Sequence, residues 1–273
     1  MDEKLRPLQL MQLEILKIVD KICRENDIKY SLYAGTLLGA VRHQGFIPWD
    51  DDLDICMERA EYDRFIKLWD ELKLQGYILQ NKENTPQFTR GFTKIRKDHT
   101  TFLQDDCERG MYHTGVFIDI FPLDRMPNSK VKQYIFKIQC MMYQLLTREF
   151  VPPKSSGMVR MISKFLLWCV PKKSRRKVRS ILLKYITKYN DRRDLKPVLI
   201  ETAESIHLAY LEDMLDSYMM IKFENDEFMC MKKWDEYLKC EYGNYTHLPP
   251  EEERAWKHHP IILDFEYNYE QLK

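Results

Sequence analysis

The chain has 273 residues, of which 44% are hydrophobic and nine are glycine, so it is long and apolar enough to bury a large core. Its formal charge is +1, from 43 lysines and arginines against 42 aspartates and glutamates. A balance this even argues against a protein that coats nucleic acid and against an acid-rich protein. We therefore expect an ordered protein in which charge acts locally.

Cysteine usage and hydropathy indicate a cytoplasmic protein. The seven cysteines are scattered and include no C-x-x-C pair, which favours reduced thiols over disulfides or a zinc site. The start of the chain is acidic and lacks the apolar stretch of a signal peptide. The longest apolar segment, MISKFLLWCV (161–170), is interrupted by Lys164 and is shorter than the roughly 20 residues of a spanning helix. No transmembrane helix is expected.

Helical and strand patterns alternate in the first half of the chain. Apolar residues at helical spacing predict amphipathic helices in 8–26 and 59–74. The segment 28–35 reads as a buried strand that ends at Gly35, and a short helix is expected after an N-cap at Thr36. Further strands are expected in 51–57, 91–97 and 115–124.

The second half begins with helices that are apolar on one side and strongly basic on the other. A further helix is expected around 234–243. We interpret the chain as three parts: a catalytic core in 1–128, an inserted or appended basic helical lobe in 129–206, and a C-terminal segment in 207–273 that packs back on the core.

Four aspartates stand close together in the segment WDDDLD, which begins at Trp49. Asp52 and Asp54 are two residues apart in an expected strand, so both carboxylates lie on the same face. Asp119 is the charged residue in the otherwise apolar run 116–121. Carboxylates that converge from neighbouring strands are what hard divalent cations require. The pattern predicts a metal site.

A helix N-terminus beside this cluster would add backbone N–H groups for phosphate oxygens. Metal and helix together are typical of metal-assisted phosphoryl transfer. Simpler interpretations stay open at this point. An Asp-x-Asp pair is often a solvated turn, and we interpret Asp50 and Asp51 as turn or capping residues. A salt bridge to Lys94 or Arg96 would neutralise Asp119 as well as a metal does.

Four stretches carry a resemblance to a known family: YAGTLLGAVRHQGFIPWDDDLDI (33–55), TKIRKDHTTF (93–102), HTGVFIDIFPLD (113–124) and WDEYLKCEYGNYTHLPPEEER (234–254). They closely resemble the LicD family of phosphotransferases, which belongs to the nucleotidyltransferase-fold superfamily and is related to the fukutin proteins. The resemblance implies an α+β fold with a nucleotidyltransferase-type mixed β-sheet flanked by helices.

The resemblance also implies roles for particular residues. The catalytic Asp-x-Asp pair of the family falls on Asp52 and Asp54, and its third acid falls on Asp119. These three would hold Mg²⁺ or Mn²⁺, with Asp119 also acting as base for the acceptor hydroxyl. Gly35 would let the backbone approach the donor phosphates, and Thr36 would cap the helix there. Arg42, Lys94 and Arg96 are candidates for phosphate binding or, equally, for ion pairs with the aspartates.

Members of this family are linked to the transfer of phosphocholine, or of glycerol or ribitol phosphate, from a CDP-activated donor to a glycan hydroxyl. The expected acceptor is therefore a cell-surface glycan such as lipopolysaccharide or teichoic acid, or its lipid-linked precursor, with no nucleic acid as partner. Two alternatives stay open. One is a nucleotidyltransferase that moves the nucleotide itself onto a small molecule or RNA. The other is an inactive binding module, against which the three retained carboxylates argue.

Other aromatic and histidine residues have weaker interpretations. Trp49, Tyr33 and Tyr112 could form an aromatic box for a quaternary ammonium, although core packing is the commoner use of such residues. His113 is interpreted as a structural histidine. The pair His258–His259 lacks cysteine or histidine partners at ligand spacing, which argues against zinc.

The basic run PKKSRRKVRSILLKYITKYNDRR (171–193) follows an apolar segment. A solvated helical face is the ordinary explanation of such a run. Because clustered basic residues are attracted to anionic lipid, we also expect peripheral, salt-sensitive association with the inner face of the membrane.

Overall fold

The computed structural model describes residues 3–104, 110–151, 156–200 and 210–272. The chain forms two compact units, which consist of 1–80, 93–122 and 214–273 in the first and of 81–92 and 123–213 in the second. Each unit combines strands with helices, and the expected α+β class with a mixed sheet is confirmed.

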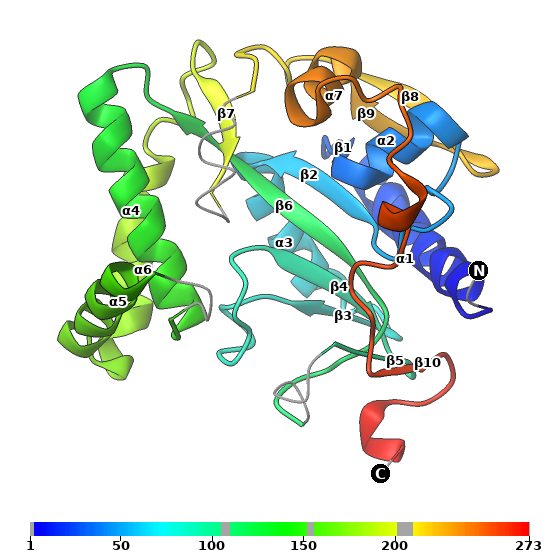
Figure 1. Cartoon of the computed structure of the whole chain (residues 1–273), viewed down its shortest axis with the longest axis horizontal. Coiled ribbons are helices and arrows are strands. Elements are labelled where there is room, and N and C mark those ends of the chain that lie inside the picture. Colours follow the sequence, from blue (N-terminus) through cyan, green and yellow to red (C-terminus); the bar gives the residue numbers. More distant parts are fainter. Residues whose placement is uncertain (1–2, 105–109, 152–155, 201–209, 273) are drawn as a thin grey trace. The chain divides into compact units, whose positions relative to one another are not determined.

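The first unit is built on a sheet with the strand order β1-β2-β6-β4-β3 (Figure 1). Neighbouring strands β4 and β6 pair antiparallel with Lys94 opposite Asp119. The expected strands in 91–97 and 115–124 are thereby confirmed. The bounds are β1 Ser31–Leu32, β2 Asp54–Glu58, β3 Tyr77–Gln80, β4 Thr93–Lys97 and β6 Phe117–Met126, whose residues from Leu123 onward belong to the second unit.

Helices and two small two-stranded sheets complete the first unit. The predicted helices of 8–26 and 59–74 are confirmed as α1 and α3, because their apolar residues at helical spacing are buried. The bounds are α1 Leu5–Glu25, α2 Ala34–His43, α3 Arg59–Leu72 and α7 Trp234–Tyr242, with β8 Tyr218–Phe223 paired to β9 Asp226–Met231 and β5 Thr101–Leu103 paired to β10 Ile262–Asp264.

The second unit contains the predicted basic helices. Strand β7 (Lys196–Leu199) pairs with the end of β6, and both pack with α4 and α6 around Phe136, Cys140 and Ile186. In contrast, α5 has no buried residue within the part of the chain that the structure describes. The helices are α4 Lys130–Arg148, α5 Gly157–Cys169 and α6 Lys172–Thr187.

The start of α2 differs from the prediction. The helix begins at Ala34 after an extended Tyr33, so Gly35 lies inside the helix and Thr36 is not its N-cap. Ala34 has a φ of +45°, a left-handed conformation that turns the chain sharply from strand to helix. Its N–H donates to Oη of Tyr237 at 3.2 Å, which holds the turn in place.

The six cysteines that the structure describes are free thiols. Across the described ranges, every helix is too short or too polar to cross a lipid bilayer.

Candidate active site

Helix α1 holds the aspartate loop, residues 50–52, in place. Gln9 and Gln12 are buried on the inner face of this helix. The Nε2 atoms of Gln9 and Gln12 donate to the backbone carbonyls of Asp50 and Asp51, each at 2.9 Å. Because buried amides gain most when their partners are also buried, these bonds hold the loop in a defined conformation.

Asp50 is not a solvated turn residue, and the prediction that it is one is wrong. Its side chain is 3% exposed, and its Oδ2 would lie 2.7 Å from a Cβ placed on residue 35. Glycine at position 35 therefore makes room for this carboxyl group. Burial and the neighbouring Asp52 carboxylate raise the pKa of Asp50 to about 8.

Asp51 is fully buried as well, and its partner comes from the far end of the sequence. Its carboxylate accepts hydrogen bonds from the backbone N–H groups of His258 (3.0 Å) and Lys257 (3.3 Å) and lies 3.1 Å from Nδ1 of His258. Burial opposes ionisation of Asp51, but these bonds outweigh it and lower its pKa. Sequence reasoning missed His258 as a site residue, because no local pattern connects it to Asp51.

The three acids predicted as metal ligands form one electrostatic cluster. Asp54 opens β2, Asp119 lies in the neighbouring strand β6, and Asp52 precedes β2 rather than lying within it as expected. Burial, followed by the charges of Asp52 and Asp119, raises the pKa of Asp54 well above its ordinary value. Burial also raises the pKa of Asp52 against the opposing effect of His258, whose Nδ1 is 3.7 Å from Oδ2 of Asp52.

Asp119 has the salt bridge that the sequence left open. Nζ of Lys94 donates to both carboxylate oxygens, at 2.7 and 3.0 Å, and both side chains are almost completely buried. Lys94 also lies 3.2 Å from the ring centroid of Phe117. The ion pair does not exclude a metal, since a carboxylate can bind a lysine and a cation together.

The chemistry of the donor set fits a divalent cation. Burial and the neighbouring carboxylates raise the pKa values of Asp52 and Asp54, and bound Mg²⁺ or Mn²⁺ would supply positive charge to them. Within the described ranges, the group of three acids with carboxylate oxygens within 4.8 Å of one another is Asp50, Asp51 and Asp52, which shares only Asp52 with the predicted set. The assignment of Asp52, Asp54 and Asp119 as metal ligands stays a prediction.

The remaining predicted residues take structural partners. Nη1 of Arg42 donates to the carbonyl of Tyr245 at 3.2 Å. Arg96 is buried in the sheet, where its guanidinium donates to Oε1 of Gln80 and to the carbonyl of Gly115, both at 2.7 Å. These bonds account for the two arginines without a phosphate, and their role in phosphate binding stays a prediction.

Thr36 has a different role from the expected cap. Its Oγ1 accepts a hydrogen bond from the backbone N–H of Asp54 at 2.8 Å. The hydroxyl therefore ties the first turn of α2 to the residue that opens β2. This bond sets the distance between the helix N-terminus and the acidic cluster.

Tyr33, Trp49 and His113 also have structural partners. Tyr33 is buried against Tyr237, with 5.3 Å between the ring centroids, so it is a core residue. Trp49 lies beneath the guanidinium of Arg254, which is 5.5 Å from the ring centroid. His113 is structural as predicted, since its Nε2 lies 3.1 Å from Oδ1 of Asp98.

The buried carboxylates at β2 and β6 lie within residues 27–155, which match the family model described as LicD/FKTN/FKRP, nucleotidyltransferase domain. This match identifies the class of the protein as the nucleotidyltransferase fold. The chain is 31% identical over 260 residues to a protein of Haemophilus influenzae named lipopolysaccharide cholinephosphotransferase LicD, a match that covers 93% of this chain and 96% of that protein. The protein belongs to the LicD family, and it is an enzyme of the LicD transferase type.

Two shorter matches fall on uncharacterized proteins. RT0683 of Rickettsia typhi is 41% identical over 78 residues, covering 29% of this chain and 25% of that protein. RP689 of Rickettsia prowazekii is 42% identical over 74 residues, which is 27% of each chain. These matches support a shared segment and carry no activity of their own.

Proposed function

We propose that the protein transfers phosphocholine from CDP-choline to a hydroxyl group of lipopolysaccharide or a similar cell-surface glycan. The observation that carries this proposal is the similarity, over nearly the full length of both chains, to a lipopolysaccharide cholinephosphotransferase. In the reaction the acceptor hydroxyl oxygen attacks the phosphorus that bears choline. The bond from that phosphorus to the bridging oxygen of the diphosphate breaks, and CMP leaves.

The site supports this chemistry residue by residue. Asp52, Asp54 and Asp119 would hold Mg²⁺ or Mn²⁺, which when bound neutralises charge on the donor diphosphate. Lys94 orients the Asp119 carboxylate through two hydrogen bonds. Asp119 would accept the proton of the acceptor hydroxyl as the new bond forms. The N-terminus of α2, which Thr36 fastens to Asp54, would bind donor phosphate oxygens.

Donor molecules labelled in two places test the reaction. CDP-choline with one label in choline and another in cytidine is incubated with the protein, Mg²⁺ and lipopolysaccharide. We expect the choline label in the glycan and the cytidine label in CMP, with no transfer after chelation by EDTA. Transfer of the cytidine label to an acceptor would instead establish a nucleotidyltransferase. Absence of any transfer with a panel of CDP-alcohols and glycans would contradict the proposal.

We also propose that the protein binds the anionic inner face of the membrane through α5 and α6. Met161, Phe165 and Trp168 of α5 are 67%, 58% and 78% exposed, which is unusual for large apolar side chains. The residues from 129 to 190 include fifteen lysines and arginines and a single acid, Glu149. An apolar helix face beside basic residues is the pattern of an interfacial helix.

The structure also selects the residues for the test. Arg175 is buried and donates to Glu149, so its loss would disturb the unit rather than a lipid contact. Exposed lysines of α6 are better targets, because each contributes about 1 kcal/mol near anionic lipid. Changing three to Gln should weaken binding to anionic vesicles in flotation by roughly a hundredfold. The test set is Lys172, Lys173 and Lys177, and the charge-matched control set is Lys17, Lys21 and Lys67.

Two further observations belong to that flotation experiment. Binding should decrease as salt rises, and neutral vesicles should bind little protein. If neutral and anionic vesicles bind equally, or if neither binds, the lobe is an ordinary packed element.

A further inference from the structure

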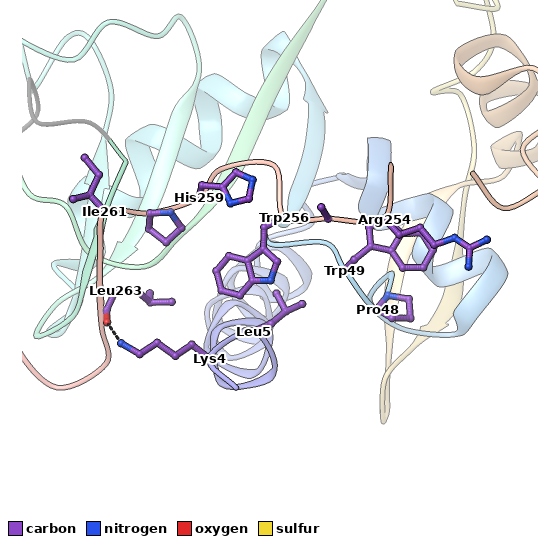
Figure 2. Close-up of a pocket in the computed structure, with 11 residues that line it drawn as sticks. Lys4, Leu5, Pro48, Trp49, Arg254, Trp256, His259, Ile261 and Leu263 are labelled. Atoms are coloured by element: carbon purple, nitrogen blue, oxygen red, sulfur yellow. Dashed lines mark hydrogen bonds between the residues drawn. The ribbon is translucent and has the colours of Figure 1, made fainter. Parts of the chain in front are cut away.

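A cavity of about 620 Å³ lies beside the aspartate loop, in the first unit (Figure 2). One wall is the start of α1 with Lys4, a second is Trp49, and the third is the segment 254–263. Figure 2 shows the indole of Trp256 in the middle of the lining residues and the side chain of Arg254 crossing Trp49. None of the roles assigned above uses this cavity.

The walls of the cavity are continuous with the residues that hold the aspartates. Trp49 directly precedes Asp50. Trp256 and His259, which line the cavity, flank the two residues whose backbone N–H groups bind Asp51. A molecule in the cavity would therefore contact residues that are next to the aspartate loop in the sequence or next to the residues that bind it.

The cavity and the start of α2 lie against different members of the loop. Asp50 faces Gly35 of α2, whereas Asp51 faces the segment that walls the cavity. The cavity-lining residues that the structure describes include none from α2. If the donor diphosphate binds at the N-terminus of α2, the cavity is left for the second substrate.

The chemistry of the lining favours a sugar that carries a negative charge. The faces of two indoles suit the apolar faces of a sugar ring, and a few polar groups beside them fix orientation. Arg254 uses Nε to bond the carbonyl of Pro249, at 2.9 Å, and brings a positive charge over Trp49. Lys4 adds a second positive charge, and the described lining residues include no acid. A choline cation is disfavoured here, while phosphate is a preferred partner of arginine.

We propose that this cavity is the acceptor subsite and that it binds a phosphorylated sugar of the glycan. The assignment rests on the proposed function in one respect, the placement of the donor at α2. Phosphoryl transfer requires the attacking and leaving oxygens roughly in line, so the acceptor hydroxyl and the departing CMP must lie on opposite sides of the phosphorus. Separate surfaces on the two sides of the aspartate loop meet this requirement.

Saturation-transfer NMR on the full chain tests the assignment with glucose 6-phosphate, glucose and CMP as probes. The wild-type protein should bind glucose 6-phosphate more tightly than glucose. Trp256→Ala should weaken glucose 6-phosphate binding by roughly tenfold, which corresponds to about 1.4 kcal/mol, and leave CMP binding unchanged. Trp256→Phe keeps an aromatic face and should retain most of the binding. Arg254→Gln should remove the preference for the phosphorylated sugar, while the exposed control Arg64→Gln should not.

The outcomes separate the subsite from the reaction. If the wild type does not bind glucose 6-phosphate, or if Trp256→Ala binds it equally well while remaining folded by circular dichroism, the assignment is overturned. Loss of CMP binding in Trp256→Ala would show that the cavity holds the donor, which also overturns it. If sugar-phosphate binding maps to the cavity but choline transfer is absent, the sugar site stands and the proposed reaction fails.

Discussion

Replacing Lys94 by Met isolates the buried ion pair at the centre of the site. The substitution removes the charge and keeps most of the side-chain volume, so Asp119 is left as a buried carboxylate without its lysine. At 2.7 Å and an effective dielectric constant of about 20, the Coulomb attraction of such a pair is about 6 kcal/mol before desolvation is subtracted. Breaking one partner of a buried pair costs about 3 to 5 kcal/mol in practice.

The assay is thermal and denaturant unfolding of the metal-free protein in EDTA. A loss of this size should lower the midpoint of thermal unfolding by roughly 6 to 15 °C in a chain of this length. The matched control is Lys67→Met on α3, because Lys67 is 81% exposed and its loss should change stability by less than about 0.5 kcal/mol. The double variant Lys94→Met with Asp119→Asn removes both charges and should recover at least half of the loss.

A second experiment repeats the unfolding measurements with Mg²⁺ present. Without Lys94 the cluster has one more uncompensated negative charge, so Mg²⁺ should stabilise Lys94→Met more than it stabilises the wild type. A Lys94→Met protein that unfolds within about 0.5 kcal/mol of the wild type would refute the account of the ion pair. Absence of any stabilisation by Mg²⁺ would refute the metal assignment alone, whereas equal stabilisation of both proteins would show that the metal does not sense the charge of Lys94.

Three further changes have distinct expected results. Asp54→Asn should abolish choline transfer in the two-label assay. The metal-free variant should be at least as stable as the wild type, because like-charge repulsion is relieved. Retained activity would contradict the assignment of Asp54 to the active site. Thr36→Val should lower the free energy of unfolding by about 1 to 3 kcal/mol, since the Asp54 N–H loses its acceptor, whereas Thr36→Ser should restore it. Glu224 accepts bonds from Arg6 and from the N–H of Phe46, and the Arg6 hydrogen bond lowers its pKa. That stabilisation is present above the unfolded pKa of about 4.3 and is lost as pH falls through the lower folded value. Glu224→Gln should thus cost about 0.5 to 1 kcal/mol at pH 7 and nothing near pH 2, measured by urea unfolding at both pH values.

Periodicity made the framework of the first unit predictable. In α3 the apolar residues Phe65 and Trp69 recur at helical spacing, and both are buried as that spacing requires. Asp119 was identifiable for the opposite reason, since a single charge in an apolar strand needs a partner. These signals are local, because residues that are close together in the sequence determine which face of a helix or strand is apolar.

Contacts between distant segments could not be predicted in this way. Nothing in the sequence around Asp51 indicates that His258 supplies its hydrogen bonds. The buried residues Asp50 and Asp51 therefore resemble a solvated turn when only the sequence is considered. Ala34 gives no sign of a left-handed conformation, which is commoner in glycine or asparagine, and the predicted helix start is therefore three residues late. The hydroxyl of Thr36 fitted a cap equally well until its partner in β2 was known.

The bond between Asp51 and His258 joins residues that are 207 positions apart, and this separation has a consequence for the newborn protein. At a translation rate of roughly 5 to 20 residues per second, about 10 to 40 s pass between the synthesis of one partner and the synthesis of the other. During that interval the nascent chain has its aspartates but lacks the segment that clamps them and walls the neighbouring cavity. The aspartate loop can therefore gain these hydrogen bonds only after nearly all of the chain has been made.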